Sequence, residues 1–309
     1  MVMLQRQLNR MDYSSGGVSR IDIPREHWHK EFLLKFVGQC DSGSSVARSN
    51  YNPFEIVSRI ELVANGSQTI KSLSGKMLYL NNIMEHGSVP DRTQTPSSTS
   101  QTNQAFGGAL SLYLDKNKDY IESLLPSHVL TSLSLVITWG TATDIDTGTS
   151  FNIDHLYCYP LLTEEQNVGQ PSEGIGILKE IEYTKTLSAS GWVELELPLG
   201  NVYNSLSLLA RDNSAPSNTI IDEFEIVMDG IEVVRKVRFD QSRAEDLKEY
   251  SLEVANQPTG FTIVDFDKGG SAPINTKGRS SMKVRFHVST TPTSVADVIV
   301  VAEELVLPR

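Results

Sequence analysis

Two hairpins with the same pattern stand 164 residues apart in this chain. Residues 59–73 read RIELVANGSQTIKSL and residues 223–237 read EFEIVMDGIEVVRKV, each with two alternating runs around a turn. The turns contain an Asn-Gly pair at 65–66 and an Asp-Gly pair at 229–230, which suit the type I′ turn because both central positions take positive φ. The repeated hairpin predicts an antiparallel β domain that is built twice.

The match continues on both sides of the hairpins in the same order. Upstream, each copy has a short strand that ends at a proline, Pro24 or Pro198, and then a strand with its apolar residues on one face. These apolar residues are Phe32, Leu34 and Phe36 in the first copy, and Leu206, Leu208 and Ala210 in the second. The matched segments are 21–36 with 195–210, 108–116 with 260–268, 133–139 with 282–288, and 151–159 with 296–306.

The offset between the copies falls steadily along the chain. It is 174 at the prolines, 164 at the hairpins, 152 at Gly108 and 149 at Leu133. The first copy therefore has longer loops, because surface loops tolerate added residues better than strands do. We place the extra residues mainly in 40–53 and 86–108.

The length of 309 residues fits two domains of about 150 residues each. We predict a first jelly roll over 18–162, a polar linker over 163–174 and a second jelly roll over 175–309, which opens with an extra strand pair. Residues 1–17 are interpreted as an N-terminal arm. Met3, Leu4 and Leu8 stand at helical spacing there, so the arm is either a frayed terminus or a helical segment that docks onto a neighbour or a lipid surface.

The strand signals predict an all-β fold of two tandem eight-stranded antiparallel jelly rolls with a few short helices. Helices are expected at 75–86, 117–125 and 240–250, and the first and third of them directly follow the repeated hairpin. The competing fold is the immunoglobulin-like sandwich, which lacks a helix after the hairpin and usually has nearer 100 residues.

Composition limits the environment and the partners. The net charge of −11 and the pI near 5.1 come without a Lys/Arg cluster, which argues against a nucleic-acid-binding surface. Cys40 and Cys158 are too few for a disulfide framework and are expected to be free thiols in a reducing compartment. With no signal peptide and no apolar run of ~20 residues, the chain is predicted to stay in a cytoplasm or to be released by lysis.

The search for chemistry predicts no catalytic residues and no cofactor. His27 and His29 flank Trp28 at a strand edge, and they are interpreted as a surface pair because a third metal ligand is not evident nearby. The loop at 144–154 is a candidate calcium site, because its acidic residues are spaced like the start of a calcium loop, although the closing Glu is missing. Its candidate ligands are Asp144, Asp146 and Asp154.

Taken together, the tandem order of elements resembles that of double jelly-roll major capsid proteins, the lineage of the adenovirus hexon and of tailless icosahedral phages with an internal membrane. The resemblance is carried by strand–Pro–strand (21–36 and 195–210), then hairpin and helix, then the closing strands, all occurring twice over 18–309. It implies a homotrimer that forms a pseudo-hexagonal block of an icosahedral shell. It also implies minor capsid and penton proteins as partners and a place in the virion capsid after assembly in the host cytoplasm. Members of this lineage often have an internal membrane beneath the shell, which would be a further partner.

Two other functions remain open from the sequence. One is a carbohydrate-binding module of a phage tail or fibre, with Trp28, Trp139 and Trp192 as stacking platforms; the opposing interpretation places these rings in the core or in interfaces. The other is a two-jelly-roll enzyme, either a hydrolase of the amidase type or a metal-dependent oxygenase, which requires His and acidic residues to converge in one cleft.

Overall fold

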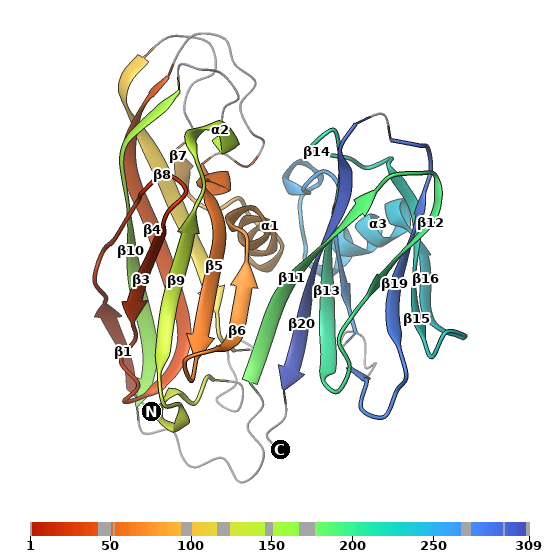
Figure 1. Cartoon of the computed structure of the whole chain (residues 1–309), viewed down its shortest axis with the longest axis horizontal. Coiled ribbons are helices and arrows are strands. Elements are labelled where there is room, and N and C mark those ends of the chain that lie inside the picture. Colours follow the sequence, from red (N-terminus) through yellow and green to blue (C-terminus); the bar gives the residue numbers. More distant parts are fainter. Residues whose placement is uncertain are drawn as a thin grey trace. The chain divides into compact units, whose positions relative to one another are not determined.

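The computed structural model describes residues 2–42, 51, 53–93, 101–115, 124–145, 151–166, 177–266, 273–292 and 294–306. The chain forms two compact units, and antiparallel strands dominate both (Figure 1). The first unit contains Met1–Asn82 and Val89–Leu178, and the main body of the second is Lys179–Leu307.

The described residues of the first half form strands, three short 3₁₀ or α-helical turns and one longer helix, α1. Its elements are β1 (Val2–Gln7), β2 (Met11–Asp12), β3 (Val18–Asp22), β4 (Trp28–Ser42), η1 (Phe54–Ile56), β5 (Val57–Ala64), β6 (Gln68–Leu73), α1 (Gly75–His86), β7 (Arg92–Thr93), β8 (Gln101–Tyr113), η3 (Ser127–Val129), β9 (Leu133–Trp139), α2 (Ala142–Ile145) and β10 (Asn152–Gln166).

The second half repeats this composition. Its elements are β11 (Ile177–Leu187), β12 (Gly191–Glu196), β13 (Val202–Asp212), β14 (Ala215–Pro216), β15 (Ile221–Met228), β16 (Glu232–Arg238), α3 (Phe239–Glu249), η4 (Val254–Asn256), β17 (Phe261–Asp265), β18 (Ile274–Asn275), β19 (Met282–Val288) and β20 (Ala296–Val306).

In the first unit the strands form two sheets. One has the order β1-β10-β4-β8-β7, and the other has the order β3-β9-β5-β6. Apolar residues alternate with polar ones because successive side chains of a strand point to opposite faces. On β4 this alternation buries Phe32, Leu34 and Phe36 and leaves Leu33 and Val37 exposed, as predicted.

The second unit has the same strand order. One sheet runs β11-β20-β13, with β17 and β18 on the far edge of β13, and the other runs β12-β19-β15-β16. Each unit therefore has eight principal strands with the same neighbours, and a helix, α1 or α3, follows the repeated hairpin. The predicted pair of eight-stranded jelly rolls is confirmed.

The strand registers are preserved as well as the strand order. Ile60 lies opposite Ile137 in the first unit, and Phe224 lies opposite Phe286 in the second. In the same way, Leu34 pairs with Leu110 and Leu208 pairs with Thr262. These pairs differ by the offsets of 164, 149, 174 and 152 found in the sequence, so the duplication holds residue by residue. The predicted match of 296–306 with 151–159 is wrong: segment 296–306 corresponds to 156–166, because Pro160 and Val300 lie opposite Leu34 and Leu208.

Both predicted turns have positive φ at both central residues. The angles are 50° and 80° at Asn65 and Gly66, and 52° and 75° at Asp229 and Gly230. A side chain secures each turn at the same position. The Asn65 Oδ1 atom accepts the amide N–H of Thr131 at 2.8 Å, and the Asp229 Oδ1 atom accepts that of Ser280 at 2.7 Å.

The N-terminus differs from its prediction. Val2–Gln7 is strand β1, which pairs antiparallel with Thr163, Gln166 and their neighbours on β10, so the predicted helical stripe is wrong. β1 and β3 occupy the positions of β11 and β12, and the strand pair that opens the second unit is therefore not extra. Strand β10 also continues to Gln166, into the segment interpreted as a linker; residues 167–176 lie outside the described residues.

The positions of the helices and of the inserted segments agree in part with those predicted from the sequence. α1 covers 75–86 as predicted, and α3 covers 239–249. Most of the helix predicted at 117–125 lies outside the described residues. The insertion assigned to 40–53 begins later, because β4 extends to Ser42, and β8 begins at Gln101 inside the segment 86–108. Among the described helices, none is long and apolar enough to span a membrane.

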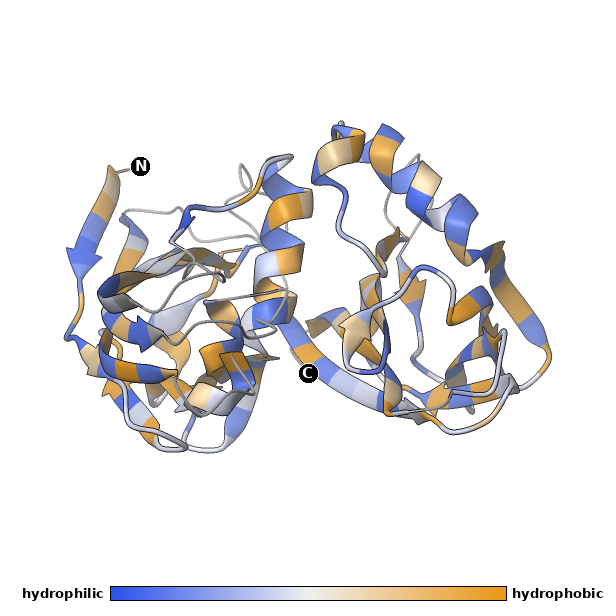
Figure 2. Ribbon diagram, turned by 90° about the horizontal axis from the view of Figure 1, so that it is seen from above, coloured by the Kyte–Doolittle hydropathy of each residue, from blue (hydrophilic) through white to orange (hydrophobic). Residues whose placement is uncertain are grey.

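Each unit has its own apolar core between its sheets. In the second unit the inner faces supply residues such as Phe224, Val284 and Phe286, all almost fully buried, and Phe239 of α3 joins them. Figure 2 shows hydrophobic and hydrophilic residues alternating along many strands. The inner positions thus stabilise each fold, and the outer positions are free to carry function.

Candidate functional site: the charged face

The outer surface of the β12-β19-β15-β16 sheet carries charged side chains on all four strands. Its inner surface holds Val193 and Leu195 of β12, with Val284 and Phe286 of β19. Since side chains alternate, the residues between them point outward. We call this outer surface the charged face; its residues are Trp192, Glu194, Glu196, Glu223, Glu225, Lys236, Arg238, Lys283, Arg285 and His287, with Asp222 beside them.

The strand register arranges these residues in rows that cross the sheet. Glu194 lies opposite Arg285, Arg285 opposite Glu225, and Glu225 opposite Lys236. The central row therefore has negative and positive charges in strict alternation over four strands. Opposite charges at directly paired positions stabilise an antiparallel sheet, whereas like charges there destabilise it. The neighbouring row is Trp192, His287, Glu223 and Arg238.

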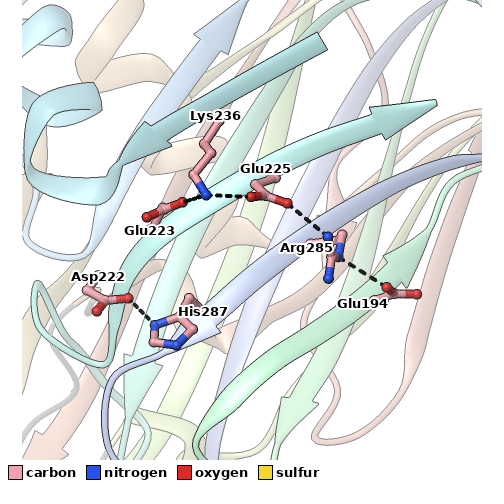
Figure 3. Close-up of polar contacts among 7 residues, drawn as sticks. All are labelled: Glu194, Asp222, Glu223, Glu225, Lys236, Arg285 and His287. Carbon is pink, nitrogen blue, oxygen red and sulfur yellow. Dashed lines mark hydrogen bonds and ion pairs between the residues drawn. The ribbon is translucent and has the colours of Figure 1, made fainter. Parts of the chain in front are cut away.

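The central row is joined by ion pairs from one side of the sheet to the other (Figure 3). Arg285 lies between two carboxylates, with Nε 3.1 Å from Glu194 Oε1 and a terminal nitrogen 3.0 Å from Glu225 Oε2. Lys236 Nζ is 2.8 Å from Glu225 Oε1 and 2.6 Å from Glu223 Oε1. Lys283 adds a contact to Glu194 at 2.9 Å. The row is thus a connected network and not a set of separate pairs.

The network favours the charged forms of Glu194, Lys236 and Lys283. The hydrogen bond from Lys283 holds the pKa of Glu194 below its usual value. The hydrogen bonds that Lys236 donates to Glu223 and Glu225 raise the pKa of Lys236, and the bond to Glu194 raises that of Lys283. These shifts widen the pH range over which the face presents a fixed pattern of charge.

Trp192 lies among these charges with 39% of its surface exposed. The guanidinium carbon of Arg285 is 4.9 Å from the ring centroid and Lys236 Nζ is 5.5 Å from it, which are cation–π distances. The ring centroid of His287 lies 5.2 Å from that of Trp192, in an edge-to-face arrangement. The Nδ1 atom of His287 is 2.7 Å from Asp222 Oδ1. The indole therefore supplies a rigid, partly exposed platform at the edge of the charge pattern.

This arrangement has the chemistry of a binding surface. Its charges are exposed in part, held in register by a sheet and paired with one another, and no nucleophile with an adjacent base stands among them. Such a surface recognises a partner by electrostatic complementarity.

Comparison with known proteins begins with two negative results. No protein-family model matches the chain, and no curated protein sequence matches it. Solved structures do match. The crystal structure of the major capsid protein of Sulfolobus turreted icosahedral virus (STIV) has a TM-score of 0.82 at 18% identity, covering 100% of this chain and 98% of that chain.

The chain has the double jelly-roll fold.

Two further solved structures agree with this assignment. The major capsid protein of bacteriophage PM2 gives a TM-score of 0.61 at 13% identity, covering 100% of this chain and 98% of that one. The PBCV-1 virus capsid gives 0.67 at 10% identity, covering 99% and 94%. The structural likeness therefore extends over the whole double jelly roll, although few residues are identical.

The calcium candidates are not assembled by the described part of the double jelly roll. Asp144 lies at the start of α2, where its Oδ2 atom accepts the amide N–H of Thr141 at 2.7 Å. Asp154 accepts a hydrogen bond from Asn152, and Asp146 lies outside the described residues. Within the described residues, no group of three His, Cys, Asp or Glu side chains is placed to hold a metal ion.

The histidine interpretation is wrong for His29. Its side chain is fully buried, and Nε2 lies 3.4 Å from Oε1 of the equally buried Glu164, which Arg6 of β1 also contacts at 3.2 Å. The sequence did not indicate this because Glu164 stands in the segment interpreted as a linker. His27 is half-buried just before β4, with its Nε2 3.3 Å from the amide nitrogen of Gln166.

The tryptophans divide between the core and the surface. Trp28 and Trp139 are buried in the first unit, where Trp139 donates its indole N–H to Ser19 at 2.9 Å. Only Trp192 of the three is exposed, so the set of sugar-stacking platforms expected from the sequence does not form. Cys40 and Cys158 are both buried and are not joined in a disulfide, as expected for thiols, and burial raises the pKa of Cys158.

The charged face itself was missed at the level of sequence. Its signal is visible in WVELE (192–196), KVRFH (283–287) and EFE (223–225), which all place charges at every second residue. Alternation alone indicates an outward face. The order of charges across the sheet appears only once the register of the strands is known.

Proposed function

We propose that this chain is a structural major capsid protein, without enzymatic activity, that tiles an icosahedral virus shell. The observation that carries the proposal is the preserved strand order and register of the two jelly rolls, together with a full-length likeness to the STIV major capsid protein at a TM-score of 0.82. A structural protein of this kind needs self-association surfaces and no active site.

The tandem fold supports a pseudo-hexagonal homotrimer as the building block. Three copies closed by threefold symmetry bring six jelly rolls around one axis, so the block approximates a hexagon. A hexagonal block tiles a surface with one chain type, although its exact symmetry is only threefold. The duplication in the sequence thus has a direct geometric use.

Further parts of the proposal come from the capsid resemblance. They are a location in the virion capsid, assembly in the host cytoplasm, contacts with minor capsid and penton proteins, and an internal membrane beneath the shell. The net charge of −11 supports this assignment by keeping unassembled blocks apart in solution.

The oligomeric state tests the proposal. Size-exclusion chromatography with light scattering should give a stable species near three times 34.2 kDa for the purified chain. Negative-stain images of that species should show blocks with a hexagonal outline. A chain that stays monomeric at high protein concentration would contradict the proposed block.

A further inference from the structure

The order of charges in the central row of the charged face has a special property. The row reads Glu194, Arg285, Glu225, Lys236, so its signs alternate and it has an even number of members. A row of this kind, read from its other end, has the opposite sign at every position. It is therefore complementary to a reversed copy of itself.

A two-fold axis parallel to the strands produces that reversal. If the axis runs between β19 and β15, a second copy laid face to face places its β16 over β12 and its β15 over β19. Glu194 then lies opposite Lys236 of the second copy, and Arg285 lies opposite Glu225 of the second copy. Symmetry repeats both pairings, so every charge of the central row faces an opposite charge and none faces a like charge. Glu225 is only 6% exposed, so the contacts between exposed groups are the two between Glu194 and Lys236.

The neighbouring row fits the same axis. Trp192 lies opposite Arg238 of the second copy, which is a cation–π arrangement, and His287 lies opposite Glu223 of the second copy. The third row contains Glu196, Lys283, Val227 and Val233 and gains no such match.

A two-fold axis perpendicular to the strands gives the opposite result. Each strand then lies over its own copy, and the central row meets either itself or the row that contains Glu223 and Arg238. Glutamate faces glutamate and cation faces cation in both cases. The charge order therefore selects one of the two face-to-face arrangements.

We propose that the charged face of the second unit binds a second copy of the same face around a two-fold axis parallel to its strands. The inference rests on the proposed function and deepens it, because it names a surface through which neighbouring trimeric blocks meet. The interface is isologous, so one patch serves as both partners and the contact closes on itself.

The size of the face fits a weak contact that is repeated many times. Four strands spaced ~4.8 Å apart and about six residues long cover roughly 400 Å². That is about half of the ~800 Å² that each partner contributes to a standard stable interface. Single contacts of this size are readily reversible, and their polar character makes them sensitive to salt, since the Debye length falls from ~30 Å at 0.01 M to ~8 Å at 0.15 M.

Two single charge reversals test the geometry. Glu194→Lys places Lys against Lys236 of the second copy, and Lys236→Glu places Glu against Glu194 of the second copy. Each variant alone should lose association between blocks by about tenfold or more, because like charges then meet twice. Mixing the two purified variants restores every contact between opposite charges, so the mixture should associate within about threefold of the unaltered protein.

The measurement is sedimentation velocity at low salt, with full-length protein and with the blocks purified before mixing. Lys248→Glu and Glu253→Lys make the same charge changes at exposed positions away from the charged face, and they should leave association unchanged. A folding defect in either test variant would not be repaired by mixing.

The outcomes separate this inference from the proposed function. If the unaltered chain forms no trimer, the proposed capsid block fails. If trimers form and the mixture associates no better than either variant alone, the two-fold pairing of the charged face is wrong while the block stands. Binding of the unaltered face to another virion protein, with no self-association at low salt, would also overturn it.

Discussion

The two jelly rolls place different chemistry at the same positions of the same sheet. In the second unit the central row of the charged face is Glu194, Arg285, Glu225 and Lys236. The register of the first unit puts Arg20, Val136, Glu61 and Ser72 at the corresponding positions. The second unit thus has a connected ion-pair network at these positions. The first unit has a mixed row there, with the apolar residue Val136 near its centre.

The inner faces of the same strands have changed much less. Ile60 and Ile137 of the first unit correspond to Phe224 and Phe286 of the second, and all four side chains are fully buried. A change at an inner position leaves a cavity or a steric clash, whereas an outer position meets water and tolerates substitution. The fold therefore constrains the inner face of each strand and leaves the outer face for binding.

A second comparison concerns a buried carboxylate. Glu164 pairs with His29 in the first unit, and Glu304 pairs with Tyr203 at the same register in the second; both carboxylates are fully buried. Burial raises the pKa of Glu164, but the hydrogen bond from His29 and the charge of Arg6 outweigh it, and the net shift is downward. The contacts described for Glu304 are with neutral groups, including Asn201, and burial raises its pKa in spite of the charge of Lys179.

The largest expected effect comes from removing the charge at these two positions. Glu164→Gln should lower the free energy of unfolding of the first unit by about 2–3 kcal/mol, because it leaves the fully buried His29 without its carboxylate partner and removes one of the two carboxylates that contact Arg6, the other being Glu26. Glu304→Gln should change the second unit by less than about 1 kcal/mol, because it removes a buried carboxylate whose described contacts are with neutral groups. Urea unfolding at pH 7 measures both, and equal losses would refute the contrast.

The same pair should show opposite dependence on pH. The pKa of Glu164 lies below its usual 4.5, so the stability from its carboxylate is present above about pH 4.5 and is lost as the pH falls through the lowered pKa. The pKa of Glu304 lies above 4.5, so its contribution is present below pH 4.5 and is lost as the pH rises through the raised pKa. The difference in stability between each Gln variant and the unaltered chain, measured from pH 3 to pH 8, should therefore have slopes of opposite sign.

The correspondence between most strands of the two copies was predictable from the sequence because inner positions carry a regular apolar period. The offsets of 174 and 149 align Ile21 and Leu135 with Leu195 and Val284, and these residues lie opposite each other in their sheets. The six residues of β1 were not predictable, since Met3 and Leu4 fit a helical spacing as well as a strand. Such a short segment takes its structure from β10, its partner strand.

The buried carboxylates show a second limit. Glu164 lies in a polar run, TEEQ at 163–166, and polarity usually indicates solvent. Its burial becomes evident only when β1 brings Arg6 and β4 brings His29 to the same place, from 158 and 135 residues away. Charge partners far apart in sequence cannot be read from a local pattern, and the order of charges on the charged face escaped prediction for the same reason.

A smaller effect should follow from making the second unit resemble the first. Arg285→Val places the residue type of Val136 in the centre of the charged row. It removes two ion pairs and leaves the mostly buried Glu225 with Lys236 as its remaining cation, so the second unit should lose about 1–2 kcal/mol. Urea unfolding followed by circular dichroism measures the loss. The reverse change, Val136→Arg, places the new guanidinium between Arg20 and Glu61, so one repulsion and one attraction offset each other and the first unit should change by less than about 1 kcal/mol. A larger loss there would contradict the argument.

The smallest effect should be the same in both units. Gly66 and Gly230 have φ angles of 80° and 75°, and no atom lies within 4 Å of the place that a Cβ atom would occupy at either position. Substitution by Ala therefore tests backbone strain alone, and each variant should lose about 1 kcal/mol. Ser67→Ala, beside the first turn, is the control and should have little effect. Thermal unfolding of the two Gly→Ala variants compares the turns directly. A loss in one unit without the other would mean that the duplicated hairpins differ in strain, although their side-chain contacts to Thr131 and Ser280 are alike.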